Sequence, residues 1–87
     1  MSYNGWLNWE TWLMALYINN DEGTQDEARA VCLQDIPEYE AVQNLREWAE
    51  ETLLNVEDEG IIADIVGGFA ADVFWLEIVR NIREGTR

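Results

Sequence analysis

The sequence predicts an all-α protein, a single small helical domain of four or five helices that spans residues 1–87. Three observations support this prediction. Apolar residues recur at helical spacing, residues that favour helix N-termini precede the first two apolar stretches, and no segment shows the apolar–polar alternation of a β-strand. Although the net charge is −13, apolar residues make up 48% of the chain, which is enough for a core and argues against an acidic disordered chain.

The first helix is expected to begin at Trp9, with Asn8 as its N-cap and Glu10 near the positive end of the helix dipole. Its apolar residues follow the i, i+3, i+4, i+7, i+8 spacing of a buried face, and they are Trp9, Trp12, Leu13, Leu16 and Tyr17. The stripe is widened by Met14, Ala15 and Ile18, so we expect this helix to run through the middle of the fold. A polar turn over 19–23 ends it.

A second, shorter helix is predicted over about residues 25–34. Thr24 is its expected N-cap, with Glu27 reaching back to it in a capping box. Its weak apolar stripe consists of Ala28, Val31 and Cys32.

A third helix is predicted from Pro37, which suits a first helical position, to about Leu54. Its inner face is expected to hold Val42, Leu45, Trp48 or Ala49, and Leu53. Its outer face carries Glu40, Glu47, Glu50 and Glu51.

The last segment, from Ile61 to about Arg83, is again apolar at helical spacing, with an expected inner face of Ile62, Ile65, Phe69, Val73 and Leu76. Gly67 and Gly68 interrupt it, and each costs about 1 kcal/mol relative to Ala inside a helix. We expect a kink, a break into two helices or a close helix crossing there. The cations Arg80 and Arg83 suit the last turns, and Gly85 is a plausible stop.

These stripes predict a core of Trp12, Leu16, Trp48, Ile65, Phe69 and Trp75. One compact core is not expected to cover the last segment on all sides. A homodimer contact through Phe74, Ile78 and Ile82 is therefore a further expectation.

Three stretches resemble a known family. They are Asn4-Gly5-Trp6 with Asn8-Trp9-Glu10-Thr11-Trp12, then Asn20-Asp21-Glu22-Gly23, then Trp75-Leu76-Glu77-Ile78-Val79. Together they resemble small uncharacterised proteins of phages, plasmids and cyanobacteria, which open with N-G-W-x-N-[YW]-E-T-W and close on a W-x-E-I-A type helix. This chain departs from the family pattern at Phe74 and Val79. The resemblance implies an all-helical fold and a phage or mobile-element setting, and it implies no activity.

Catalysis is not expected. The chain has no His, which removes the usual general base and the commonest metal ligand. Cys32 has no His to activate it and is interpreted as a core thiol. Asp64 and Asp72 are expected on the exposed edge of the final segment. Residues 55–60 approximate half of a calcium loop, but Val66 stands where a bidentate Glu belongs, so we predict no enzyme, no metal site and no cofactor.

The charge indicates the class of partner, because the chain has 18 Asp and Glu but only five Arg and no Lys. Such a surface repels nucleic acid and membranes and attracts basic proteins. The predicted partner-binding residues are Glu40, Glu47, Glu50, Glu51, Glu57, Asp58 and Glu59. With Asn44 between them, Glu40, Glu47 and Glu51 form a line at 4-3-4 spacing. Carboxylates at i and i+4 lie ~6 Å apart along the axis, close to what a phosphate-binding groove expects of its ligand.

Three accounts of the charge remain open. In the first, the protein is a DNA mimic that inhibits a host nucleic-acid-binding defence protein of restriction or CRISPR type. In the second, the charge serves solubility alone. In the third, the protein is a helical adaptor or homodimer without mimicry, and its charge only discourages wrong contacts. The opening block is interpreted as structural, with Trp6 packing back against the helix as a staple, and the alternative is an exposed aromatic–acidic patch of Trp6, Trp9 and Glu10 that binds a partner. The sequence has no secretory signal pattern and one unpaired Cys, so we expect a cytoplasmic protein.

Overall fold

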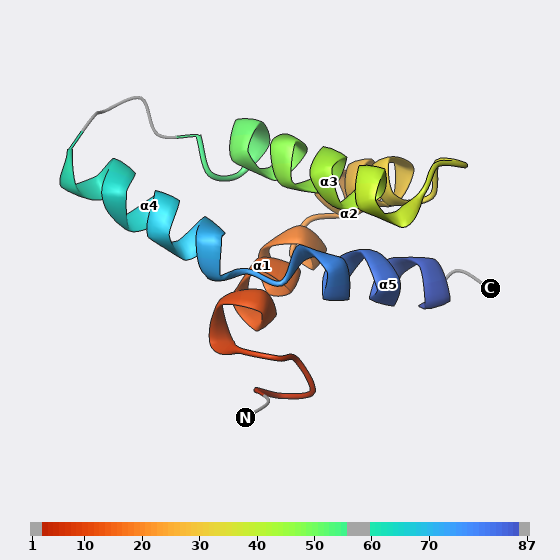
Figure 1. The fold of residues 1–87 in the computed structure, drawn as a ribbon, viewed down its shortest axis with the longest axis horizontal. Coiled ribbons are helices and arrows are strands. Elements are labelled where there is room, and N and C mark those ends of the chain that lie inside the picture. The colour runs from red at the N-terminus through yellow and green to blue at the C-terminus, as the bar shows by residue number, and fades with distance from the viewer. Residues whose placement is uncertain (1–2, 56–59, 86–87) are drawn as a thin grey trace.

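The computed structural model describes residues 3–55 and 60–85, and over these residues it forms five α-helices and no β-strand (Figure 1). The helices are α1 (Trp9–Asn19), α2 (Glu22–Cys32), α3 (Glu38–Thr52), α4 (Ile61–Asp72) and α5 (Trp75–Gly85). Ahead of α1, Tyr3 and Trp6 form an isolated antiparallel bridge. The predicted all-α fold is therefore confirmed.

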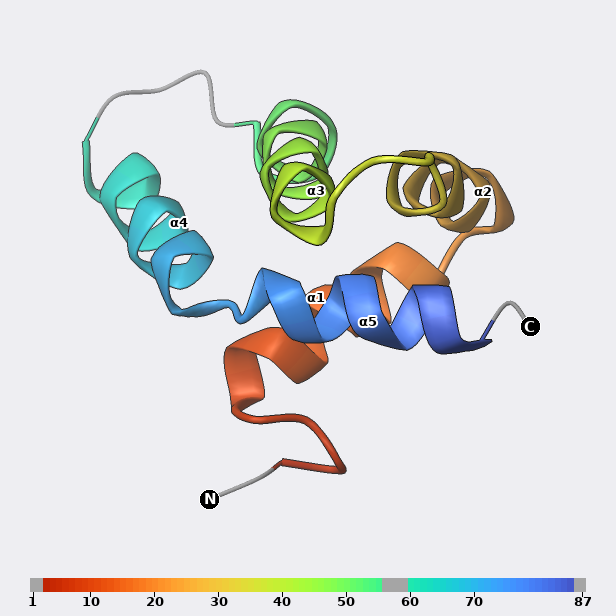
Figure 2. The same ribbon diagram turned by 45° about the vertical axis from the view of Figure 1, so that its right-hand side comes forward.

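The helices form a small bundle in which α3 packs on both α2 and α5, and α1 packs on α2, α4 and α5. Figure 2 shows α2 and α3 nearly end-on, with α5 crossing beneath them and α4 standing to one side. The largest fully buried side chains lie where α1, α2, α3 and α5 meet, and they are Met14, Ile18, Leu45, Ile78, Val79, Thr11 and Cys32. The core therefore belongs mainly to four of the five helices.

Helix α1 begins as predicted but buries a different face. The Asn8 side chain accepts a hydrogen bond from the Thr11 backbone N–H at 2.9 Å, which confirms the N-cap. The predicted core face is wrong, because Trp9, Leu16 and Tyr17 are 46, 49 and 55% exposed. The buried residues are Thr11 and the three that widened the predicted stripe, Met14, Ala15 and Ile18. Thr11 and Ala15 are small enough to let neighbouring helices approach closely, which a Trp-bearing face does not allow.

The N-cap of α2 is Asp21, three residues before the predicted Thr24. One Asp21 carboxylate oxygen accepts hydrogen bonds from both the backbone N–H and the hydroxyl of Thr24, at 3.1 and 3.2 Å. The Thr24 hydroxyl is thus a partner of the earlier cap, and the helix starts at Glu22. Ala28 and Cys32 are buried, as predicted.

Helix α3 starts directly after Pro37 and ends two residues earlier than predicted. Its buried residues are Ala41, Leu45 and Ala49, and half-buried Val42, Trp48 and Leu53 pack against the core. The predicted inner and outer faces of this helix are confirmed.

The final segment breaks at Val73, not at the two glycines. Val73 adopts an extended backbone with φ −76° and ψ 131°, while Gly67 and Gly68 remain helical within α4. The physical cause is the contact with the N-terminal block, described below, that holds the backbone on both sides of Val73. The glycines lower the helical propensity of α4 without breaking it.

The predicted burial along this segment is partly wrong. Ile62 and Ile65 are 60 and 65% exposed and Leu76 is 38% exposed, whereas Val73 and Trp75 are buried as expected. Ile78 is a core residue with 2% exposure, so it is not available for the predicted dimer contact. Phe74 is 50% exposed, and a homodimer contact there stays a prediction. The chain is apolar on most sides of α4, and periodicity alone did not identify the side that faces the core.

In the described part of the chain, none of the helices is long and apolar enough to cross a membrane.

Candidate functional site

The outer side of α3 is the strongest candidate site, because its acidic side chains gather on one face. We call Glu40, Glu47, Glu50 and Glu51 the α3 acidic face. At 3.6 residues per turn they occupy roughly 100° of the helix circumference, opposite the buried residues Ala41, Leu45 and Ala49. Glu47, Glu50 and Glu51 are exposed, and Glu40 is half-buried. The described helices α2 and α5 pack on the other sides of α3 and leave this face open (Figure 2).

The spacing along the face follows from helix geometry. Glu47 and Glu51 are one turn apart, about 6 Å along the axis, and Glu40 to Glu51 covers about 16 Å. Gln43 and Asn44 lie between them and are also exposed. The face therefore presents carboxylates and amides, and no apolar side chain, along most of the helix.

One cation lies beside this face. The Arg46 Nε donates to the Glu50 Oε1 at 2.8 Å, in an i, i+4 pair whose side chains are 46 and 50% exposed. An ion pair this exposed contributes little to stability, and it balances one carboxylate at the edge. Within the described residues no cation pairs with Glu40, Glu47 or Glu51, so the rest of the face keeps its negative charge.

The acidic surface continues onto α2. The Trp48 Nε1 lies 3.5 Å from the Glu27 Oε1, a long hydrogen bond across the seam between α2 and α3. Asp26 and Glu22 are also exposed, but they lie about 100° and 140° around α2 from Glu27 and so point away from this seam. Glu27 therefore adds a carboxylate beside α3, whereas Glu22 and Asp26 lie outside this surface.

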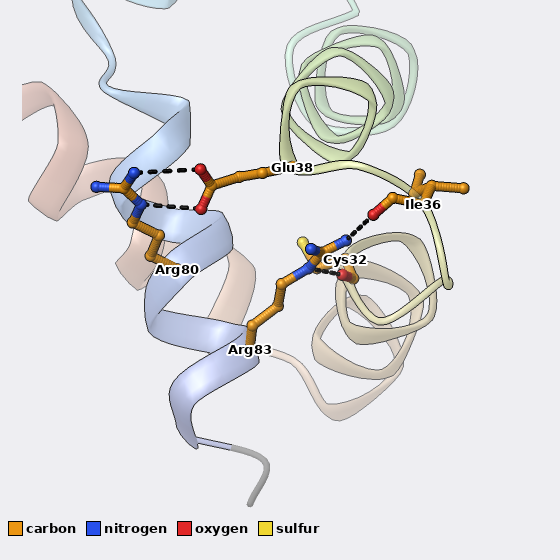
Figure 3. A network of polar contacts seen from close by, with 5 residues as sticks. All are labelled: Cys32, Ile36, Glu38, Arg80 and Arg83. Atoms are coloured by element: carbon orange, nitrogen blue, oxygen red, sulfur yellow. Dashed lines mark hydrogen bonds and ion pairs between the residues drawn. The ribbon is translucent and has the colours of Figure 1, made fainter.

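Two other arginines hold α5 against the α2–α3 connection (Figure 3). The Arg80 Nε and Nη2 donate to the two Glu38 carboxylate oxygens at 2.9 and 3.1 Å. The hydrogen bond from Arg80 lowers the pKa of Glu38 below its usual value. The Arg83 Nε donates to the Cys32 carbonyl at 2.7 Å and its Nη2 to the Ile36 carbonyl at 3.1 Å. These cations, which the sequence placed near the end of the last helix, have structural partners on other elements.

Three predicted site residues, Glu57, Asp58 and Glu59, lie outside the described residues, as does most of the calcium-loop stretch over 55–60. In the ranges 3–55 and 60–85, no three His, Cys, Asp or Glu side chains are arranged to hold a metal ion. Asp64 and Asp72 are exposed, as expected. Burial raises the pKa of the Cys32 thiol to about 11 although Arg83 opposes this, so Cys32 is a protonated core thiol at neutral pH.

The structure also explains the opening sequence block, whose long-range role the sequence did not reveal. Thr11 is fully buried, and its Oγ1 accepts a hydrogen bond from the Phe74 backbone N–H at 2.9 Å. The same hydroxyl donates to the Asn8 Oδ1 at 2.6 Å. The one signal for this role was a polar residue inside an otherwise apolar stripe.

Two further bonds complete this contact, which we call the N-terminal clasp (Leu7, Asn8 and Thr11). The Asn8 Nδ2 donates to the Asp72 carbonyl at 2.7 Å, and the Leu7 backbone N–H donates to the Glu77 Oε1 at 2.9 Å. The clasp thus holds the junction of α4 and α5. The opening block and the Trp75-Leu76-Glu77 block, at opposite ends of the sequence, are in direct contact.

The aromatic part of the opening block is only partly buried. Trp6 is half-buried and packs against the core, which agrees with a structural role. Trp9 remains 46% exposed and meets Phe69 edge-on, with ring centroids 6.2 Å apart.

Comparison with known proteins identifies a family but no activity. No curated protein and no solved structure matches this chain. A family model matches residues 1–81, and the chain accordingly belongs to DUF7249, a family of unknown function.

Proposed function

We propose that this chain is a small acidic phage or mobile-element protein that inhibits a host nucleic-acid-binding defence protein of restriction or CRISPR type. The inhibitory surface in this proposal is the α3 acidic face, which takes the place of a DNA backbone in a basic groove. The phage setting rests on the resemblance of the opening and closing sequence blocks to small phage and plasmid proteins. In this proposal the protein inhibits by occupying the basic groove of its partner, so no catalytic step and no cofactor are involved.

The observation that carries the proposal is the open line of carboxylates on α3. Like charges one turn apart cost a helix roughly 0.2–0.5 kcal/mol per pair, and Glu47 and Glu51 form such a pair with no cation between them. A chain of 87 residues with net charge −13 has the option of placing its few arginines here. Arg46 pairs with Glu50 at the edge of the face, and Arg80 and Arg83 make structural contacts elsewhere, which leaves Glu40, Glu47 and Glu51 negative.

The charge also selects the class of partner. An acidic face is repelled by nucleic acid and attracted to the cationic groove that binds nucleic acid. Contacts of this type increase the association rate and weaken as salt screens them. The partner is therefore a basic nucleic-acid-handling protein, and nucleic acid competes for the same groove.

To test this, the proteins of a bacterial lysate that bind heparin are passed over a column that carries the immobilised protein. The proposal predicts that at least one protein is retained at low salt and is released by excess duplex DNA. Reversal of three exposed acids, Glu47→Lys, Glu50→Lys and Glu51→Lys, should abolish its retention. The matched control reverses three exposed acids outside the face, namely Glu22→Lys, Asp26→Lys and Asp35→Lys, and changes the net charge equally.

The two triple variants separate a specific face from bulk charge. Retention by the control variant, together with loss in the α3 variant, supports the proposal. Equal loss in both variants shows that only total charge matters and contradicts it. Circular dichroism of both variants should match the wild type, because exposed substitutions usually change stability within ~0.5 kcal/mol.

The alternative, a helical adaptor without mimicry, is favoured by a different observation. Several large apolar side chains outside the α3 acidic face are exposed, Ile61 and Trp9 among them. A partner that binds there is retained at high salt and is not released by DNA. The same column experiment therefore distinguishes the two functions.

A further inference from the structure

The outer side of α4 exposes three isoleucines, each more than half exposed. We call Ile61, Ile62, Ile65 and Phe69, with the adjoining Trp9, the α4 apolar face. Ile61, Ile62 and Ile65 are 78, 60 and 65% exposed. Phe69, which is half-buried and packs against the core, borders them on α4, and Ala70 is the one described residue of this helix that is buried. The indole of Trp9 meets Phe69 and carries the surface onto α1.

Gly68 lies at one edge of this face, about one turn beyond Ile65, and the monomer gives no reason for a glycine there. Its backbone is helical, and a Cβ added to it meets no atom within 4 Å. A glycine in a helix interior lowers helix stability relative to alanine. Small residues on an exposed helical face let the backbone of a second helix approach closely. Gly68 therefore has a role if another helix crosses α4 at this point.

The rim of the face is negative and has no cation of its own. Neither α1 nor α4 contains Arg or Lys, and their acidic residues are Glu10, Asp64 and Asp72. Asp72 is exposed in the last turn of α4, where the negative end of the helix dipole adds to its charge. A second copy of this chain brings the same negative rim and a net charge of −13. A helix with basic flanks complements the rim, and another copy does not.

We propose that the α4 apolar face is a docking site for an amphipathic helix of a protein partner. The apolar stripe of that helix covers Ile61, Ile65 and Phe69, and its Lys and Arg side chains lie beside Asp64 and Asp72. The two helices cross at Gly68. This site is separate from the α3 acidic face, and its occupation requires neither DNA mimicry nor a phage origin.

The test uses labelled model peptides and fluorescence anisotropy. The probe is an amphipathic helix of Leu and Lys, with Leu at i, i+3, i+4 and i+7. One comparison peptide has the same composition in alternating order, and another replaces every Lys with Glu. The wild-type protein should bind the Leu–Lys helix at least tenfold more tightly than either comparison peptide, because apolar pattern and positive flanks are both required.

Matched variants locate the binding surface. Ile61→Ser with Ile65→Ser should weaken binding of the Leu–Lys helix at least tenfold, while Tyr39→Ser with Leu33→Ser, which removes two exposed apolar side chains elsewhere, should change it less than twofold. Reversal of Glu47, Glu50 and Glu51 to Lys should leave the tenfold preference over the alternating peptide intact. Loss of that preference in the α3 variant instead assigns binding to the α3 acidic face and overturns the proposal.

Gly68→Ala tests the helix crossing, because replacing a glycine that has no binding role would change the melting temperature but not the affinity. It should raise the melting temperature of the free protein and weaken binding of the Leu–Lys helix at least fivefold. Unchanged affinity in Gly68→Ala overturns the crossing at this residue. Sedimentation of the wild type as a dimer in moderate salt, abolished by the two Ile→Ser changes, assigns the face to a second copy and overturns the proposal as well.

Discussion

Thr11→Val tests the N-terminal clasp most sharply, because valine has nearly the shape of threonine but no hydroxyl. In the wild type the Thr11 Oγ1 accepts from the Phe74 N–H at 2.9 Å and donates to the Asn8 Oδ1 at 2.6 Å. Thr11 is fully buried, so water does not replace its hydroxyl in the folded protein. The substitution thus leaves the Phe74 N–H without its acceptor at the junction of α4 and α5.

The expected magnitude follows from these bonds. The hydrogen bond from the Phe74 N–H is part-buried, and a donor left there without its partner costs about 1–3 kcal/mol. The Asn8 Oδ1 keeps the Thr11 backbone N–H and loses little. We therefore expect Thr11→Val to lower the free energy of unfolding by about 2 kcal/mol. In a domain of this size that corresponds to about 8–16 °C in melting temperature.

Thr11→Ser is the matched control, because it keeps the hydroxyl and removes the methyl group. One buried methyl contributes about 0.8 kcal/mol, so Thr11→Ser should be the milder change. Urea unfolding followed by tryptophan fluorescence measures the stability of both variants. An unchanged m-value shows that the surface exposed between the folded and the unfolded state is the same as in the wild type. If Thr11→Val is as stable as the wild type, or more stable than Thr11→Ser, the clasp does not hold the junction and the reasoning fails.

Three further predictions concern other contacts. The hydrogen bond from Arg80 lowers the pKa of Glu38, so the stabilisation by this ion pair is present at neutral pH and is lost as the pH falls through the lowered pKa. Glu38→Gln should therefore destabilise the protein more at pH 7 than in acid, and equal destabilisation at both pH values would argue against the ion pair. Cys32, with its pKa near 11, should react with a thiol reagent at pH 8 only as fast as the chain unfolds, and rapid labelling of the native protein would show that it is not buried. Arg83→Met should cost about 1–3 kcal/mol in urea unfolding, because the Cys32 and Ile36 carbonyls lose a charged donor, and a loss below ~0.5 kcal/mol would mean that water satisfies them.

The sequence was most informative where a helix has two unlike faces. In α3 the apolar residues Leu45 and Ala49 and the acidic residues Glu47 and Glu51 lie on opposite sides, so both the core face and the candidate site followed from periodicity. Helices α1 and α4 are apolar on most sides, and there periodicity does not select the buried face. It selected Trp9 and Leu16 in α1, and the structure buries Met14 and Ile18.

Contacts between distant residues account for the other differences. The break at Val73 depends on hydrogen bonds from Asn8 to Asp72 and from Phe74 to Thr11, across more than 60 residues of sequence. Local propensity favoured a break at Gly67 and Gly68 instead. The two glycines lower helix stability by about 1 kcal/mol each but do not themselves hold an extended backbone, whereas the two hydrogen bonds, one part-buried and one exposed, hold it at Val73.

The most direct test of the central claim is a map of the binding surface at residue level. The measurement is the change in backbone amide signals of the isotope-labelled protein when the DNA-displaced partner is added. Our account predicts that the changes centre on the outer side of α3, at Glu40, Glu47 and Glu51, and that added duplex DNA reverses them. Changes confined to Trp9, Ile61 and Ile65, or changes that DNA does not reverse, would contradict the proposed mimicry.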